Sequence, residues 1–191
     1  SISDLEAMQQ ELDYFPNVKL VFLGECGLDN EALAEYRDQV RDRYKLVWTV
    51  SCGSKLKVRT DATTFMPVRE YVYYFNDEEA YNLRYCEDMV CVDLGHNYLR
   101  SCDWAAYMPK LKYLILAHNN GLRDISGLAN CKELVYLEIG WTALRDLSPL
   151  LGCTSLVDLN ISGTFADVSP LVGMDWLETL YANLCGLTEQ E

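Results

Sequence analysis

One pattern of apolar residues recurs at a near-constant interval along the C-terminal half of the sequence. The template is L-x-x-L-x-L-x-x-N-x-L, in which other apolar residues can replace Leu and Thr or Cys can replace Asn. Five copies begin at Met89, Leu111, Leu134, Leu156 and Leu177. Successive starts lie 22, 23, 22 and 21 residues apart. Because a single copy cannot bury its apolar residues alone, this pattern predicts a solenoid of stacked units.

The centre of each copy, x-L-x-L-x, alternates apolar and variable residues with a period of two. This alternation predicts a short strand with one buried face, and stacked copies then form a parallel sheet. The Asn position lies where the chain turns inward beside buried carbonyl groups, which need hydrogen-bond donors. We expect donors from Asn97, Asn119, Thr142, Thr164, Cys185 and, in a weaker copy that begins at Val18, Cys26.

A repeat of 22 residues leaves room for only a short 3-10 turn on the side opposite the sheet. The pairs Ser148-Pro149 and Ser169-Pro170 predict a helix N-cap followed by Pro at the first helical position. The N-terminal segment differs, because Asp29 or Asn30 precedes about three helical turns. The residues of these turns that are expected to face inward are Leu33, Tyr36 and Val40.

We therefore predict one α/β leucine-rich repeat domain over residues 1–191, with helices at its N-terminal end. Residues 1–44 form a helical part with longer repeats, residues 45–87 an interruption, and residues 88–191 the 22-residue repeats. A further weak copy begins at Tyr44, and the interruption contains an expected hairpin that turns at Cys52-Gly53-Ser54. Its tyrosines either cover an open edge of the solenoid or contact a partner; they are Tyr71, Tyr73, Tyr74 and Tyr81.

Most of the eight cysteines fall on repeat positions that the template buries. Cys86, Cys131 and Cys153 each lie three residues before a repeat start, and Cys102 aligns with Ile125. We expect these thiols to pack as small apolar side chains. Cys91 falls on an outward strand position, and the sequence has no C-x-x-C pair to indicate a zinc site.

The net charge and the hydropathy of the chain limit the classes of partner that it can bind. The chain has 29 acidic and 16 basic residues, a net charge of −13, so nucleic acid and anionic lipid surfaces are poor partners. No apolar run approaches the roughly 18 residues that span a bilayer, so we expect no membrane insertion. The chain begins with Ser1 rather than Met, and we expect that a targeting segment has been removed.

The later repeats, with "LRDISGLANCKELVYLEIG" and "LRDLSPLLGCTSLVDLNISGT", resemble the internalin-type 22-residue leucine-rich repeats of bacteria. The N-terminal part, with "YFPNVKLVFLGECGLDNEAL", resembles leucine-rich repeat proteins of gut-dwelling Firmicutes that are usually predicted to be exported. The resemblance implies a secreted or cell-surface location, with the cytoplasm as the alternative. It also implies a protein partner bound through the concave sheet, with host and cell-surface proteins as the candidates.

The variable residues beside the buried Leu positions should face outward on the concave side. The expected partner-binding strip is Phe22, Trp48, Asp93, Tyr113, Ile115, Tyr136, Glu138, Trp141, Asn160 and Tyr181. Aromatic residues are over-represented in this set, and exposed apolar patches mark contact surfaces. The alternative is that contacts within the protein or between its copies fill this surface.

The two histidines, His96 and His118, occupy the same position in adjacent repeats, about 5 Å apart by the spacing of strands. Three interpretations stay open: exposed residues at the loop edge, part of a protein-binding patch with Trp141, Tyr113 and Tyr136, or metal or acid–base chemistry with Asp93. No cofactor is indicated.

The sequence contains no nucleophile, zinc-protease, phosphate-loop or dinucleotide motif. We therefore predict a non-catalytic protein–protein interaction module rather than an enzyme. The alternatives are a structural spacer or surface arm of a larger exported protein, and a glycan-binding surface.

Overall fold

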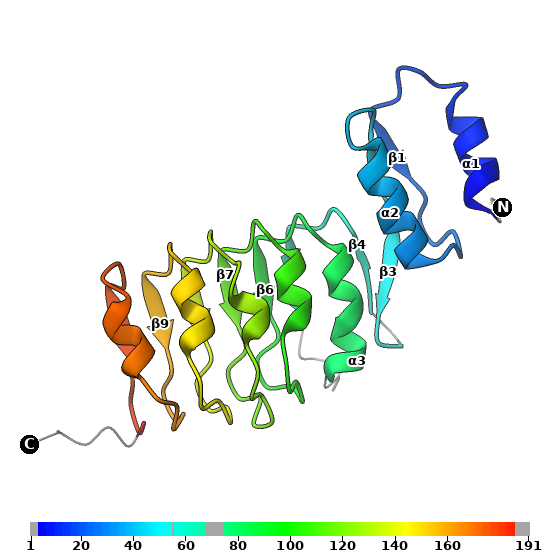
Figure 1. Cartoon of the computed structure of the whole chain (residues 1–191). Coiled ribbons are helices and arrows are strands. Elements are labelled where there is room, and N and C mark those ends of the chain that lie inside the picture. The colour runs from blue at the N-terminus through cyan, green and yellow to red at the C-terminus, as the bar shows by residue number, and fades with distance from the viewer. Residues whose placement is uncertain (1–3, 55, 68–74, 186–191) are drawn as a thin grey trace, which may run out of the picture.

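The structure is a computed structural model that describes residues 4–54, 56–67 and 75–185. It is a leucine-rich repeat solenoid in which short strands line one face and helical turns line the other (Figure 1). The N-terminal helices lie at one end of the molecule, and the repeats extend from them in a row.

A parallel sheet runs through the repeats in the order β10-β9-β8-β7-β6-β5. Its strands are β5 (Thr64–Phe65), β6 (Cys91–Asp93), β7 (Tyr113–Ile115), β8 (Tyr136–Glu138), β9 (Asp158–Asn160) and β10 (Thr179–Tyr181). The opposite side carries the short helix α3 (Asp77–Ala80) and five 3-10 turns. These are η1 (Tyr81–Tyr85), η2 (Asp103–Tyr107), η3 (Ser126–Leu128), η4 (Ser148–Gly152) and η5 (Ser169–Gly173). The predicted sheet direction and short convex turns are confirmed.

The N-terminal part contains α1 (Leu5–Leu12), β1 (Leu20–Phe22), α2 (Asn30–Val40) and β2 (Lys45–Val47), with β1 and β2 paired in parallel. Asp29, not Asn30, is the N-cap of α2, because its carboxylate accepts the Ala32 N–H at 3.0 Å. The inward residues of α2 are the predicted ones, Leu33, Tyr36 and Val40. The expected hairpin is present as β3 (Thr49–Cys52) and β4 (Leu56–Arg59), which pair antiparallel.

Salt bridges join this N-terminal part to the first repeat. Arg41 contacts Glu87 at 2.6 Å, and Lys45 and Lys110 contact the two oxygens of Asp88 at 2.6 and 2.5 Å. These pairs lie around a charged hollow at the junction. Of the tyrosines predicted either to cover an edge or to contact a partner, Tyr71, Tyr73 and Tyr74 lie outside the described residues, and Tyr81 is 49% exposed.

The template's apolar positions form one continuous core. Leu114, Leu137 and Leu159, at the centre of their strands, are fully buried, whereas the equivalent Leu180 of β10 is 44% exposed. Strand β10 is the last in the sheet and has a neighbour on one side only among the described strands. Each turn therefore completes the burial of the one beside it.

The predicted donors at the Asn position are confirmed where their bonds are described. The Asn119 amide donates to the carbonyls of Leu94 and Leu116 at 2.9 and 2.8 Å and accepts the Leu99 N–H at 2.9 Å. Thr142 donates to the Ile139 carbonyl at 2.8 Å. The other donors of this kind are Asn97, Thr164 and Cys185.

The predicted Ser N-caps are wrong. Ser148 is the first residue of η4 and its side chain caps nothing; instead Asp146 accepts the Ser148 N–H at 2.8 Å and its hydroxyl at 2.9 Å. Asp167 makes the same two bonds to Ser169. The Ser hydroxyls thus donate to the preceding carboxylates, which are strong acceptors, instead of accepting N–H groups of the 3-10 turns.

The cysteines predicted to pack are buried, with 0–2% exposure at Cys86, Cys102, Cys131 and Cys153. All eight thiols are free. Burial raises the pKa of Cys131 to about 11 and that of Cys153 to about 12. Cys91 is half-buried, in line with its outward strand position.

Replacing Asn119 by Ala should lower the free energy of unfolding by about 3 kcal/mol, because three buried hydrogen bonds are lost. Urea unfolding followed by circular dichroism measures the change. The matched control is the exposed neighbour Asn120, whose replacement by Ala should alter stability by less than about 0.5 kcal/mol. Equal effects of the two changes would contradict the assigned role of Asn119.

A thiol reagent such as DTNB should label Cys26 and Cys91 in the folded protein at pH 8. The deeply buried thiols should react only after unfolding, because the reagent needs an accessible thiolate and burial raises their pKa. Mass spectrometry of the labelled peptides identifies the sites. Rapid labelling of Cys102 or Cys153 before unfolding would be inconsistent with this core.

Candidate functional site

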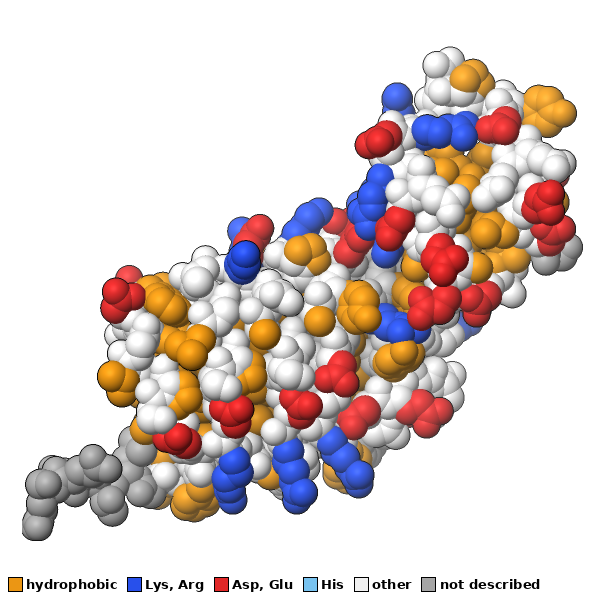
Figure 2. Space-filling model, viewed as in Figure 1, with side chains coloured by type: hydrophobic (Ala, Val, Ile, Leu, Met, Phe, Trp, Pro, Cys, Tyr) orange, Lys and Arg blue, Asp and Glu red, His pale blue; other side chains and the backbone are white. Residues whose placement is uncertain are grey.

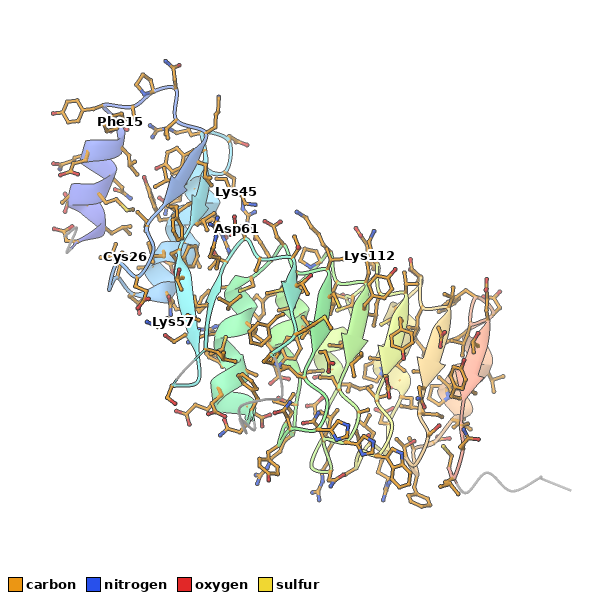
Figure 3. All side chains as sticks on the ribbon, turned by 180° about the vertical axis from the view of Figure 1, so that it is seen from behind. Phe15, Cys26, Lys45, Lys57, Asp61 and Lys112 are labelled. Atoms are coloured by element: carbon orange, nitrogen blue, oxygen red, sulfur yellow. The ribbon has the colours of Figure 1, made fainter. Side chains whose placement is uncertain are left out.

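The outward residues of the six-stranded sheet form two columns on its concave face (Figure 3). The register places Cys91, Tyr113, Tyr136, Asp158 and Thr179 in one column. The other column is Asp93, Ile115, Glu138, Asn160 and Tyr181. Tyr113 and Tyr181 are 47% and 48% exposed, and the remaining members are half-buried. All strip residues predicted on strands β6–β10 therefore lie together on one surface.

Hydrogen bonds hold several of these side chains in place. The Asp93 carboxylate accepts the Gly95 N–H at 3.0 Å, and the Asn160 amide oxygen accepts the Ser162 N–H at 3.0 Å. The Tyr136 hydroxyl donates to Glu138 at 3.2 Å. Burial, followed by the nearby Glu138 carboxylate, raises the pKa of Tyr136 to about 12, so this hydroxyl keeps its proton at neutral pH. The surface is one of ordered tyrosines and carboxylates.

Trp48 does not belong to this surface, and that prediction is wrong. It is 1% exposed, and its indole N–H donates to Asn30 at 2.9 Å. The cause is the register of β2, in which Leu46 pairs with Val21 and so occupies the buried position. Slipping a strand by one residue exchanges its two faces, so Trp48 turns inward.

Phe22 is exposed as expected, but it lies on β1 in the separate two-stranded sheet rather than with the other members of the strip. The guanidinium of Arg59 lies 4.5 Å from the centre of its ring. This cation–π contact occupies Phe22 within the N-terminal part.

A ladder of stacked rings follows the carboxyl ends of the strands. The rings of His96 and His118 are 4.2 Å apart and 17° from parallel, and those of His118 and Trp141 are 5.8 Å apart and 5° from parallel. All three residues have positive φ, at 59°, 60° and 57°. We call these three residues the ring ladder. The predicted neighbourhood of the two histidines is confirmed.

The backbone explains why the three rings align. The His96 N–H donates to the Ala117 carbonyl at 2.8 Å, His118 donates to Gly140 at 2.9 Å and Trp141 donates to Ser162 at 2.7 Å. In each bond, the N–H of a ladder residue donates to a carbonyl in the next repeat. The acceptor residue directly precedes the position that is equivalent to the ladder residue. The inter-strand hydrogen bonding thus continues past the strands and superposes the side chains.

Gly163 occupies the same position in the following repeat, with φ of 72°. A Cβ atom there would lie 2.7–2.9 Å from atoms of the Trp141 ring, so the glycine backbone packs against the outer face of the indole. Left-handed backbone costs a residue with a side chain roughly 1–2 kcal/mol, and glycine nothing. At three positions of the ladder a residue with a side chain adopts this unfavourable backbone conformation. The ladder ends at the fourth position, where the residue is glycine.

Ligand chemistry at the histidines meets a geometric obstacle. Stacked imidazoles present their faces to each other, so their ring nitrogens do not converge on a common point. Within residues 4–54, 56–67 and 75–185, no three His, Cys, Asp or Glu side chains are grouped so that they could hold a metal ion. The carboxylate of Asp93 is engaged with the Gly95 backbone.

Comparison with known proteins identifies the type of repeat. No protein-family model and no curated protein sequence matches the chain. Among solved structures, the internalin inlF of Listeria monocytogenes superposes with a TM-score of 0.50 at 26% identity, over 52% of this chain and 29% of that one. The internalin inlC2 of the same species superposes with a TM-score of 0.50 at 21% identity, over 63% of this chain and 61% of that one.

The fold is internalin-like. Both neighbours are bacterial leucine-rich repeat proteins, and this chain spans 29% and 61% of their lengths. At 21% identity, the second match establishes the fold alone. The partners of this internalin-like solenoid are therefore argued from its own surface.

Sequence reasoning missed the ring ladder's conformation, although the signal was present in part. His96, His118, Trp141 and Gly163 fall on one repeat position, and glycine at such a position indicates positive φ. The stacking itself depends on loop geometry that no pattern of letters specifies.

Replacing Gly163 by Ala should lower the melting temperature and change Trp fluorescence, because the new methyl group clashes with the Trp141 ring at positive φ. We expect a loss of about 1–3 kcal/mol, from strain and displacement of the ring. Replacing Gly121 by Ala is the control, since a Cβ there meets its nearest neighbours at an ordinary 3.6 Å. If Gly163 tolerates Ala as well as Gly121 does, the glycine does not support the ladder.

Proposed function

We propose that this chain is a non-catalytic protein–protein interaction module that binds its partner through the concave face of the sheet. The proposal rests mainly on the row of Tyr113, Ile115, Tyr136 and Tyr181, which share one ordered surface. Tyrosine provides a large contact area at a small entropic cost, and it is a frequent anchor of interfaces. Asp93, Glu138 and Asn160 add polar groups between the tyrosines.

The geometry supports a protein rather than a small molecule as partner. The two columns extend over five strands, which at about 4.8 Å per strand form an open strip roughly 20 Å long. A strip of this length matches one side of a protein interface better than it matches an enclosed pocket.

The proposed location is outside the cell, in keeping with the resemblance to exported repeat proteins. In the part of the chain that the structure describes, no helix is long and apolar enough to cross a membrane. Free cysteines are compatible with an oxidising exterior here, because burial raises the pKa of most of these thiols. Within this proposal, residues 1–191 act as one domain, and residues 1–44 and 45–87 lead into the repeats of residues 88–191.

A double substitution tests the concave assignment. Replacing Tyr113 and Tyr181 by Ser should leave folding intact, since both are about half exposed, and should weaken partner capture at least about tenfold. The measurement is pull-down from host-tissue extract with quantitative mass spectrometry. The control double variant carries Ser at Tyr14 and Tyr107, which are 83% and 56% exposed on other surfaces.

A protein captured by wild type and by the control, but depleted with the concave variant, supports the proposal. If the concave variant captures the same proteins at the same level, the concave face is not the binding surface. A glycan array run in parallel distinguishes the glycan alternative. If the wild-type chain captures no specific protein and binds no glycan on the array, the result favours the spacer alternative.

A further inference from the structure

The carboxyl-end rim of the repeats carries a second set of aligned side chains. Lys112, which directly precedes β7, lies at the upper edge in Figure 3, so the carboxyl ends of the strands lie at the lower edge. Along that edge, Arg100, Arg123 and Arg145 are exposed at equivalent positions of consecutive repeats. We call these three residues the arginine row. Figure 2 shows Lys and Arg side chains lined up along this lower rim, with acidic side chains above them.

The arginine row differs from the other described arginines in its partners. Arg37, Arg41, Arg43, Arg59 and Arg84 each form a salt bridge with Asp or Glu. Among the residues described, no carboxylate lies within salt-bridge distance of Arg100, Arg123 or Arg145. In a chain with 29 acidic and 16 basic residues, three aligned arginines without such a partner are an unusual feature.

Nearby carboxylates are held elsewhere. Asp77 accepts the N–H groups of Arg100 and Ser101 at 2.8 and 3.2 Å. Asp124 and Asp146 accept the N–H groups at the start of η3 and η4, both at 2.8 Å. These carboxylates therefore bind backbone N–H groups on the convex side and do not form salt bridges with the guanidinium groups at the rim.

The contacts of Arg145 are with neutral groups. Its guanidinium donates to the Leu144 carbonyl at 3.1 Å and lies 5.9 Å from the centre of the Phe165 ring. Neither contact neutralises the positive charge, so Arg145 can still attract an anion.

The arginine row and the ring ladder have the same extent. The row ends at Asp167, whose N–H donates to the Arg145 carbonyl at 2.9 Å, and the ladder ends at Gly163 in the same repeat. In each loop the arginine follows the ladder residue by only four or five positions. A shallow hollow lies between them in the first two loops, lined by His96, Asn97, Tyr98, His118, Asn120 and Gly121.

The faces of the ladder's inner rings are covered and are not open to a ligand. His118 is covered on both sides by its stacked neighbours, and the Trp141 ring packs between His118 and Gly163. A sugar ring therefore cannot stack on the interior of the ladder. The guanidinium groups of the arginine row therefore favour a ligand rich in anionic acceptors.

We propose that this rim binds a short acidic segment of a partner protein, with two or three Asp or Glu residues within about five positions. The arginine row spans about 10 Å over two inter-strand steps, which is the length of roughly three extended residues. A nucleic acid is the weaker candidate, because its phosphates continue beyond this length over an acidic surface. At physiological salt, screening over about 8 Å lets the local row dominate the overall charge of −13.

Peptide selection with the full chain tests the chemistry. Random octapeptides displayed on yeast are selected with labelled protein and sequenced. We expect the selected peptides to be enriched in clustered Asp and Glu. Enrichment of neutral or basic peptides, or no enrichment, would overturn the proposal.

Variants then locate the binding surface. The rim variant replaces Arg100, Arg123 and Arg145 by Gln, and the control variant likewise replaces Arg43, Lys57 and Lys112, which are exposed and paired elsewhere. Both lose three positive charges, so they match in overall charge. Fluorescence anisotropy with a selected acidic peptide should show about tenfold weaker binding to the rim variant, through loss of three exposed ion pairs, and less than about twofold to the control.

Two further measurements distinguish binding at the rim from binding at the concave face and from binding of a sulfated glycan. The Tyr113 and Tyr181 double variant should bind the acidic peptide normally, because those residues lie on the concave columns. Equal weakening of the rim and control variants would mean non-specific charge attraction and would overturn the proposal. A heparin fragment that outcompetes the peptide at the arginine row would assign the rim to a sulfated glycan instead.

Discussion

Carbonyl groups buried between successive turns of the coil need donors, and every other feature depends on how they are satisfied. Asn119 joins two repeats, because its amide donates to Leu94 of the preceding turn as well as to Leu116 of its own. Thr142 supplies a single bond within its own repeat. The buried polar network is thus richest in the first 22-residue repeats and simpler further along, while the apolar core around it continues without interruption.

Once the inward positions are committed to this core, the outward ones carry the differences between repeats. The same coil presents a concave face of tyrosines and carboxylates, a rim of rings and arginines, and a convex side where Asp146 and its equivalents hold the 3-10 turns. Regular stacking aligns side chains from residues more than twenty positions apart at near-constant spacing. This is how the six-stranded sheet, whose strands are only two or three residues long, builds extended binding surfaces.

Much of this architecture was predictable because it follows from local rules repeated many times. The buried columns, the parallel sheet and the short convex turns all follow from the spacing of residues such as Leu114 and Leu137. The errors had two different causes. Trp48 turns inward because β2 is shifted by one residue where the repeat is irregular, whereas Ser148 does not cap η4 because its hydroxyl donates to Asp146.

The site was less predictable for a physical reason. Which positions face outward follows from period two, but whether a charged side chain is paired depends on residues distant in sequence, as Arg41 and Glu87 illustrate. The stacking of His96 on His118 depends likewise on positive φ and on hydrogen bonds between loops. The identity of a partner is harder still to predict from this sequence, because it depends on a second molecule.

The half-exposed Leu180 has a consequence for how the molecule moves. Each turn contacts only adjacent turns, so the free energy of local opening should rise inward from β10, where one side of the core is uncovered. Amide protons of β10 would then exchange with solvent through small local fluctuations, while those of β7 would exchange only through much larger opening fluctuations. Tyr181 would sample many orientations before binding and Tyr113 few, so the two ends of one face would meet a ligand with different degrees of preorganisation.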